Sequence, residues 1–370
     1  MPIPKTLNDI LALPTAPFLE TAVLSYIAKA CGKLAGVKAR FDHHGNLLAH
    51  YRFAPRARTP LAFVAHTDHP GFIALDMLDA RTVRAAFRGG VKSEYFSGAR
   101  VRFWSAGRWV RGRVSEISRA TRIADVPGWS SRPEEVPLRV AAPVAPQSLG
   151  MWDLPDPVLG GDLVQATACD DLAGSAAMLT LLQRLSRKRS QAEVYCLFTR
   201  AEEVGFAGAI AAARTHTVPR QVPIISVETS STLPHAPIGD GPIVRVGDRS
   251  SVFSPSLIAF CERVAKSFAR RRKGFIYQRK LMDGGSCEAT PFVAYGYVAA
   301  GVCIALGNYH NMDGQRAKIA SEYISLHDWN CMVDLFEALV LDEGDRDQEV
   351  RSLRERMDQR YAEYEALLHK

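Results

Sequence analysis

The middle of the chain differs in character from the sequence on either side of it. From residue 75 to residue 161, short β-prone segments such as Val101-Arg102-Phe103-Trp104 are separated by Gly, Pro and Ser, and no convincing helix is visible. Before and after this stretch, short apolar runs alternate with helical patterns, which is typical of an α/β domain. We therefore predict a discontinuous α/β domain, residues 1–74 and 162–345, with an inserted small β-barrel-like domain, residues 75–161.

The α/β segments carry patterns that locate individual elements. Short apolar runs predict buried strands, and apolar residues recurring every three to four positions predict helices. Strands are expected at 61–65, 193–199, 222–227 and 298–306, and helices at 18–34, 170–188, 206–215 and 255–270. This alternation predicts an α/β fold with a mixed, largely parallel sheet flanked by helices.

Residues 346–370 are predicted to form a charged helical C-terminal tail. Within it, Leu353, Met357, Tyr361 and Tyr364 follow one another at helical spacing. Two interpretations remain open from this pattern. The tail is either an arm that packs on a partner subunit or a helix surrounded by solvent.

Composition is ordinary for a globular protein. Of 370 residues, 47% are hydrophobic and 23% are charged, and no apolar run reaches the roughly 18 residues of a membrane span. The N-terminal residues lack the charged-then-apolar pattern of a secretory signal. The seven cysteines are scattered without a Cys-x-x-Cys pair, which favours reduced thiols. We therefore expect a cytoplasmic protein without a membrane partner.

The net charge of +7 raises the question of nucleic-acid binding. The densest basic run is Arg270-Arg271-Arg272-Lys273, which has few interleaved aromatics and belongs to no recognisable nucleic-acid motif. Such a run is usually a solvated face. We expect no nucleic-acid partner.

Histidine and acidic residues close several of the predicted strands. His66 follows one apolar run, the pair Glu202-Glu203 follows the next, and Glu228 follows a third. Asp170-Asp171 stands just before a predicted helix, and His310 follows the last apolar strand. In open α/β sheets, functional groups gather at the C-terminal ends of the strands, so these side chains should meet in one crevice.

These residue types suit a site for two divalent metal ions. Zinc and similar ions take imidazole nitrogen and carboxylate oxygen, and two neighbouring ions need a carboxylate that bridges them. One further carboxylate must stay free to take a proton from water. Asp68, two residues after His66, is suited to accept the other ring N–H of that histidine. The sequence thus predicts a two-metal hydrolytic site.

Several motifs resemble those of the M42 family of metallo-aminopeptidases, within the wider M20/M28/M42 clan of zinc-peptidase-like fold. The family pattern Glu-Glu-Val-Gly is matched in full at residues 202–205. His-x-Asp-Glu-x-Gly resembles residues 66–71, and Asp-Asp-Arg-x-Gly resembles residues 170–174. Further similarity runs through residues 239–242 and 283–286, so that the likeness covers about residues 15–340.

The resemblance implies a role for each of these residues. Asp170 would bridge the metals and Glu202 would be the general base, while His66, Glu203, Glu228 and His310 would be the terminal ligands. It also implies two zinc ions, with cobalt or manganese as alternatives, peptide substrates, and a homo-oligomer assembled partly through the β module.

The chain departs from the family pattern at three positions. His69 stands where the family has Glu, Leu172 replaces Arg, and Glu228 stands where Asp is typical. Since Glu at the last position occurs elsewhere in the clan, a carboxypeptidase or an amide deacylase remains an alternative to the aminopeptidase. A catalytically silent scaffold is a further alternative from another class.

Each assignment also has a plainer interpretation. A single histidine is often structural, and adjacent carboxylates such as Asp170-Asp171 are often a helix N-terminus. His327 competes with His310 as a ligand, although it more naturally begins a helix. His235 lies in a polar loop that could line the substrate pocket. The sequence contains no His-Glu-x-x-His, Gly-x-Ser-x-Gly or phosphate-loop motif.

Overall fold

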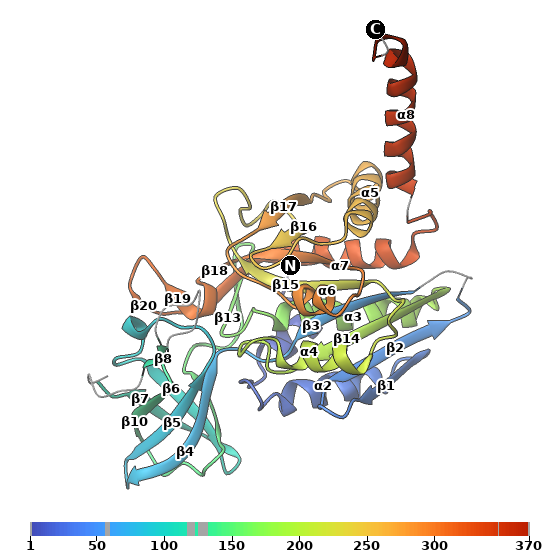
Figure 1. Ribbon diagram of the computed structural model, residues 1–370. Coiled ribbons are helices and arrows are strands. Elements are labelled where there is room, and N and C mark those ends of the chain that lie inside the picture. The colour runs from blue at the N-terminus through green and yellow to red at the C-terminus, as the bar shows by residue number, and fades with distance from the viewer. Residues whose placement is uncertain (1, 56–59, 117–122, 125–131, 347, 369–370) are drawn as a thin grey trace.

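An 11-stranded mixed sheet forms the centre of the α/β part (Figure 1). The structure is a computed structural model that describes residues 2–55, 60–116, 123–124, 132–346 and 348–368. The strand order is β1-β2-β14-β3-β15-β18-β21-β13-β12, with β16 paired to β18 and β17 paired to β16. These strands are β1 (Val37–Phe41), β2 (Leu47–Phe53), β3 (Leu61–His66), β12 (Val158–Gly160), β13 (Leu163–Ala166), β14 (Ala192–Thr199), β15 (Ile224–Ser231), β16 (Ile243–Asp248), β17 (Gln278–Met282), β18 (Ala299–Gly307) and β21 (Glu322–Ser325).

The central strands of the sheet are parallel. β3 lies between β14 and β15 and is parallel to both, and β15 is parallel to β18. Their outer neighbours, β2 beside β14 and β21 beside β18, are antiparallel. The predicted mixed sheet is confirmed, and its parallel strands end at one common edge.

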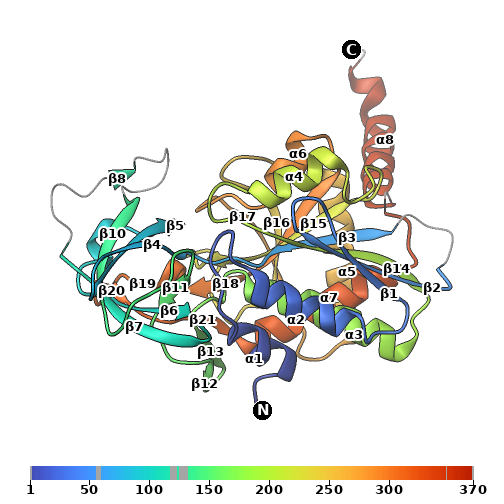
Figure 2. The same cartoon turned by 90° about the horizontal axis from the view of Figure 1, so that it is seen from below.

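Helices cover both faces of the sheet (Figure 2). α1 (Lys5–Leu11), α2 (Thr21–Cys31), α3 (Leu172–Lys188) and α7 (Leu326–Leu341) lie on one face, with α5 (Pro255–Arg271) beside α7. α4 (Ala207–Thr215) and α6 (Ala289–Ala294) lie on the other. Side chains fix the starts of three long helices, because Asp171, Ser254 and Ser325 each accept a main-chain N–H of the first turn.

The inserted part is a closed antiparallel barrel of order β10-β5-β4-β11-β6-β7. Its strands are β4 (Gly71–Asp79), β5 (Thr82–Arg88), β6 (Arg100–Ser105), β7 (Arg108–Val114), β10 (Glu135–Val140) and β11 (Leu149–Trp152). Aromatic side chains, including Phe72, Phe87 and Trp152, fill its core. The predicted boundary at residue 75 falls inside β4, and the boundary at 161 falls between β12 and β13, which belong to the large sheet.

Short elements complete the described chain. They are the single-turn helices η1 (Ser93–Tyr95) and η2 (Tyr309–Asn311), and the pairs β8 (Ile123–Ala124) with β9 (Arg132–Pro133) and β19 (Met312–Asp313) with β20 (Lys318–Ile319). η1 is a turn of helix in a stretch for which the sequence predicts none. The tail forms α8 (Gln348–Leu368), which stands away from the rest of the molecule (Figure 1).

Three further expectations concern surfaces and thiols. All seven cysteines are free and buried. The basic run at the end of α5 is exposed, and Arg272 there lies 3.3 Å from Asp334. None of the helices in the described part of the chain combines the length and apolar character that crossing a bilayer requires.

Candidate metal centre

Six of the predicted site residues meet in one buried cluster at the C-terminal edge of the central strands. They come from separate elements: the end of β3, the residue before the N-cap of α3, the turn after β14, β15, and η2. The six are His66, Asp170, Glu202, Glu203, Glu228 and His310.

Glu228 reaches the cluster in a way that the sequence did not indicate. It was expected at the end of its strand, but β15 continues to Ser231. β15 pairs with β3 from Ile224 to Ser226, which lies opposite Val64, and continues beside β18 as far as Ser231. Glu228 and His66 each lie two residues beyond this last pair, so they are level with each other. Since side chains two residues apart on a strand point to the same face, both follow the direction of the pair before them.

Asp170 lies between the two histidines. Its Oδ1 is 3.3 Å from Nε2 of His66, and its Oδ2 is 3.7 Å from Nε2 of His310. Glu228 Oε1 adds a second oxygen 3.5 Å from His66 Nε2, and Glu203 Oε2 lies 3.3 Å from His310 Nε2. Each histidine thus has one terminal carboxylate beside it, and the two share Asp170.

Glu202 occupies a more open position than the other carboxylates. Its Oε2 is 4.0 Å from Nε2 of His66, the longest of these contacts. Its side chain is 11% exposed, whereas that of Glu203 is 2% exposed. Among the acids of the cluster, Glu202 is accordingly well placed to meet water from the cleft.

Main-chain oxygens orient both imidazoles. Nδ1 of His66 is 3.1 Å from the carbonyl oxygen of Asp68, and Nδ1 of His310 is 2.6 Å from the carbonyl oxygen of Gly90. A carbonyl only accepts, so each ring carries its proton on Nδ1 and presents the Nε2 lone pair to the cluster. Gly90 follows β5 of the barrel, so the inserted part helps to position a site residue.

The role predicted for Asp68 differs from what the structure shows. Its carboxylate Oδ1 is 3.6 Å from His66 Nδ1, and its carbonyl is the nearer acceptor. The carboxylate instead accepts the main-chain N–H groups of Glu202 and Glu203, at 3.0 and 3.1 Å. Asp68 is therefore a positioning residue for the turn that carries both glutamates.

Two further buried carboxylates hold the backbone of the cluster. Asp171 accepts the N–H of Gly174 as the cap of α3 and the hydroxyl of Thr229 at 2.7 Å, so the predicted cap is confirmed. Glu322, which the sequence analysis missed, accepts N–H groups from Cys169, Asp170 and His310 at 2.8, 3.0 and 2.8 Å. It fixes the segments of two site residues at once.

His69 and His327 lie outside the cluster. His69 is buried beneath it, with Nδ1 2.7 Å from the carbonyl oxygen of Asp170 and Nε2 2.9 Å from the amide oxygen of Asn311. His327 lies in the first turn of α7, where its ring contacts Cys331. His69 thus supports the backbone of Asp170, and His327 lies at the start of a helix, as predicted.

Several acidic side chains share this buried volume, and their burial and mutual proximity shift the pKa values of the cluster. Burial raises the pKa of Glu202 well above its usual range, and burial together with the neighbouring Glu228 does the same for Asp170. Burial alone would lower the pKa of His66, but Glu202, Asp170 and other acids around it raise that pKa well above its usual value. The cluster therefore favours cations.

A neutral carboxyl group lies next to this cluster. Burial raises the pKa of Glu288, at the start of α6, to about 8. Its Oε1 is 2.5 Å from Thr199 Oγ1, which also lies 3.2 Å from the carbonyl oxygen of Ala65. The single hydroxyl proton of Thr199 cannot serve both acceptors, and Oε2 of Glu288 is buried without a hydrogen-bond partner in the described structure.

A cleft leads to the cluster. Its volume is about 630 Å³ including the part open to solvent, and its walls include Ser230, Ser231, Leu233, Ser286 and Tyr309. His235, which was expected near the pocket, is exposed and does not line it, because its ring turns to the carbonyl oxygen of Leu281.

Arg245 forms part of the cleft wall and was not predicted. It is only 2% exposed, and its two terminal nitrogens contact the Ser230 hydroxyl at 3.1 Å and the Met282 carbonyl at 3.4 Å. Nε has no hydrogen-bond partner in the described structure. The carboxylates of Glu228 and Asp248 lie near enough to raise the pKa of the guanidinium, so the protein itself offsets part of its charge.

The residues present fit divalent metal ions. Ligand atoms of His66, Glu202 and Glu228 lie within 4.8 Å of one another, and so do those of Asp170, Glu203 and His310. Oδ1 of Asp170 and Oε1 of Glu203 are buried without a hydrogen-bond donor. Imidazole nitrogen with carboxylate oxygen is the donor set of zinc, cobalt or manganese sites, and the fold and the cluster together define a metal-dependent hydrolase.

Comparison with known proteins identifies the family. Residues 130–320 match the M42 glutamyl aminopeptidase family, and the chain belongs to it. A curated relative from Acetivibrio thermocellus, described as an aminopeptidase, is 26% identical over 260 residues, which cover 67% of this chain and 73% of the relative. The enzyme is accordingly an aminopeptidase by family.

Solved structures share the fold. The aminopeptidase APDkam598 from Desulfurococcus kamchatkensis has a TM-score of 0.74 at 20% identity, covering 92% of this chain and 94% of its own. The Pyrococcus horikoshii TET1 peptidase, which assembles into a tetrahedron or a large octahedral shell, has a TM-score of 0.71 at 19% identity, covering 91% and 99%.

Proposed function

We propose that the protein is a co-catalytic two-metal aminopeptidase that releases residues from the N-terminus of peptides. The observation that carries the proposal is the placement of Asp170 between two histidines, each with its own carboxylate. Asp170 would bridge the two ions, His66 and Glu228 would hold one, and Glu203 and His310 would hold the other. Zinc, cobalt or manganese, when bound, would polarise the scissile carbonyl and acidify the attacking water.

Glu202 is the general base of this proposal. Its carboxylate takes a proton from the water that attacks the scissile carbonyl, and it returns the proton to the amine that leaves. Burial raises its pKa, which suits a group that must hold a proton between these two steps. Asp68 keeps Glu202 in place by accepting its main-chain N–H.

The decisive variant is Glu202→Gln. We expect turnover of a short peptide with a free N-terminus to fall by at least about 10²-fold, with zinc still bound, because the amide cannot accept the proton. Glu94→Gln, which changes an exposed glutamate of η1 in the same way, serves as the control. Turnover by Glu202→Gln at the rate of that control would refute the assigned base.

Arg245 supports a preference for a substrate that carries a carboxylate. In an aminopeptidase this group is the side chain of an acidic first residue, whereas in the carboxypeptidase alternative it is the terminal α-carboxylate. We expect Arg245→Met to lower kcat/KM for a peptide beginning with Glu at least tenfold more than for one beginning with Gln. An equal loss for both would leave Arg245 a structural role.

One experiment separates the remaining alternatives. A peptide is supplied with its N-terminus free or acetylated, with zinc or cobalt present and with a chelator as control. Metal-dependent stepwise release from the free N-terminus supports the proposal. Trimming from the C-terminus, release of acetate, or no cleavage of either form favours the carboxypeptidase, the deacylase or the silent scaffold, respectively.

The proposal also covers the oligomeric state of the enzyme and its cellular compartment. Assembly of the TET1 peptidase into closed shells supports a homo-oligomer here as well. Seven buried free cysteines support a reducing compartment such as the cytoplasm.

A further inference from the structure

The C-terminal helix α8 carries an exposed apolar stripe that the catalytic proposal does not use. The helix has 21 residues, a length of about 30 Å. Its apolar side chains are between 45% and 70% exposed, namely Val350, Leu353, Met357, Tyr361, Tyr364, Leu367 and Leu368. Large apolar surface in such a row is characteristic of a protein–protein contact.

The stripe follows an 11-residue repeat. Val350 and Tyr361, Leu353 and Tyr364, and Met357 and Leu368 are each eleven positions apart. At about 100° of rotation per residue, these six side chains fall within an arc of about 80°. An 11-residue period gives about 3.67 residues per turn, so the stripe stays on one side along the entire helix.

Among the residues that the structure describes, few cover α8 along most of its length. It stands away from the body, and its packing partner there is α5 (Figure 1). An isolated helix of this length is marginally stable in water, since most helical stability in proteins comes from packing of the apolar face. The stripe therefore needs a partner.

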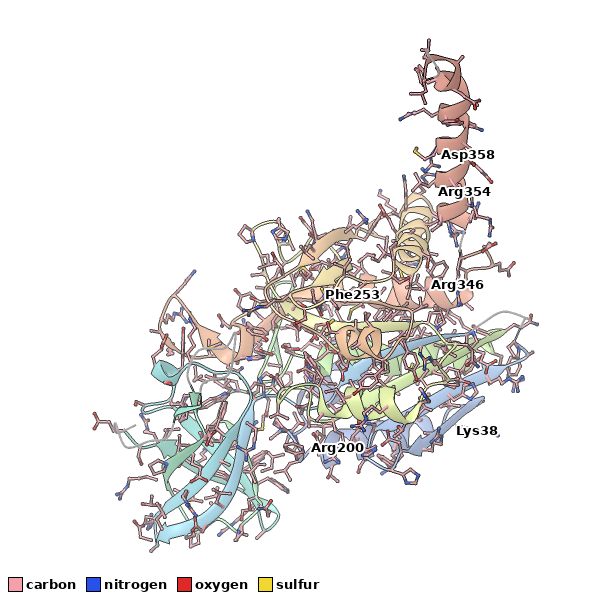
Figure 3. The ribbon with its side chains drawn as sticks, in the orientation of Figure 1. Lys38, Arg200, Phe253, Arg346, Arg354 and Asp358 are labelled. Atoms are coloured by element: carbon pink, nitrogen blue, oxygen red, sulfur yellow. The ribbon has the colours of Figure 1, made fainter. Side chains whose placement is uncertain are left out.

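The charges on α8 favour another protein helix over a membrane as that partner. Its polar positions hold four arginines and five acidic residues. Helices that lie on anionic lipid have a polar face rich in Lys and Arg, and this helix does not. Arg354 and Asp358, which lie one turn apart on the helix, are both exposed and 3.9 Å from each other (Figure 3).

The stripe is nearly symmetric about position 359. Val350 and Leu368 are equally far from this position along the helix axis, and so are Met357 and Tyr361. A rotation of 180° about an axis perpendicular to the helix at this position therefore exchanges the heights of the two residues in each pair. A two-fold axis there would let one stripe cover another copy of itself, as in an isologous interface.

Two pairs of opposite charges beside the stripe fit the antiparallel arrangement. One flank carries Arg351, Arg354, Asp358 and Glu365, and the other carries Arg356, Arg360 and Glu363. Antiparallel helices set each flank against the same flank of the partner, so Arg354 meets Glu365 of the partner subunit and Arg356 meets Glu363 of the partner subunit, while Asp358 and Arg360 each lie near their own copy at the centre. Parallel helices would bring Asp358 beside Arg360 of the partner subunit, but they would set Arg354 beside Arg356 of the partner subunit and Glu365 beside Glu363 of the partner subunit, and these like-charge contacts are unfavourable.

We propose that two copies of this chain pair through α8 as antiparallel helices, tail against tail. Val350 packs near Leu368 of the partner subunit, and the central contact is made by Met357 and Tyr361. The bodies lie at opposite ends of the pair, about a helix length apart. The tail is thus an assembly contact separate from the barrel, and it joins subunits independently of the catalytic centre.

Cross-linking of single cysteine variants tests the pairing and its direction. Val350→Cys and Leu368→Cys, on differently tagged chains, are co-expressed and oxidised; the seven native cysteines are buried and do not compete. We expect a disulfide-linked mixed dimer, and little linkage when either variant is present alone. Ser352→Cys with Ala366→Cys, on the opposite face of the helix, is the matched control and should stay unlinked.

A second measurement follows the mass of the assembly. Leu353→Glu/Tyr364→Glu should weaken tail association at least tenfold in analytical ultracentrifugation, while Gln359→Glu/Ala366→Glu, which adds the same charge on the polar face, should not. Linkage of either single variant with itself, equal linkage of the control pair, or no linkage with an unchanged mass would each overturn the proposal.

Discussion

Replacement of Glu322 by Gln tests how the backbone of the metal centre is held. The Glu322 carboxylate accepts three main-chain N–H groups, two through Oε2 and one through Oε1. Glutamine keeps one acceptor oxygen and turns an NH₂ group toward the remaining donor. If the oxygen stays with Cys169 and Asp170, the N–H of His310 loses its partner inside a fully buried site.

The size of the effect follows from these contacts. A hydrogen bond to a charged acceptor contributes about 1.5–3 kcal/mol, and a buried donor left without a partner costs about 1–3 kcal/mol. We expect Glu322→Gln to lower the free energy of unfolding of the metal-free protein by about 2–4 kcal/mol. Because His310 and Asp170 lose their alignment, zinc affinity should also fall by about 10- to 100-fold, as for other residues that support metal ligands.

Two titrations measure this prediction. Urea unfolding of the metal-free protein gives the stability, and competition with a coloured chelator gives the zinc affinity. Glu94→Gln, the same change on an exposed helical turn, is the control for both. If Glu322→Gln keeps both the stability and the zinc affinity of the parent, the carboxylate does not hold the two segments, and the reasoning is wrong.

Two further predictions concern protons and metal. The pKa of Glu288 is about 8 in the folded protein against 4.5 for an ordinary glutamate, so its contribution to stability is present below pH 4.5 and lost as the pH rises through 8. Urea unfolding of the metal-free protein should therefore show that Glu288→Gln removes about 4 kcal/mol of the stability difference between pH 5 and pH 9; an unchanged difference would contradict this. Zinc at a hundred times its Kd should raise the unfolding free energy of the parent by about 2.7 kcal/mol for each ion bound, and a His310→Ala variant should gain less; equal gains would contradict the assignment of His310.

Much of the fold could be predicted because its signals are local. The apolar runs that became β3 and β18 are buried along their length, β14 is mostly buried, and α3 ends at Lys188 as predicted. The barrel was visible as a stretch without helical periodicity. The exact limits of the barrel could not be predicted. The first residue of β4, Gly71, pairs with Arg88 of β5, and this register depends on both strands together.

The residues of the candidate site also fall into two groups, those that a local sequence pattern reveals and those that only the folded structure reveals. His66 is the last residue of β3, and the Glu202-Glu203 pair and His310 come within a few residues of the ends of β14 and β18, so the local pattern predicted them. Glu322 could not be found in that way, because it acts on Asp170 across 152 positions of sequence. Arg245 and Glu288 likewise gain their character from burial, which depends on the packing of the whole domain.

The contact between Gly90 and His310 shows that the insertion and the catalytic domain are not independent units. The carbonyl oxygen of Gly90, 2.6 Å from Nδ1 of His310, sets which ring nitrogen carries the proton. His310 also adopts a left-handed backbone, with φ of 53°, which a non-glycine residue keeps only where its surroundings hold it. Glu322 holds it from the side of the sheet and Gly90 from the side of the barrel. The position of the barrel therefore contributes to the orientation of this imidazole.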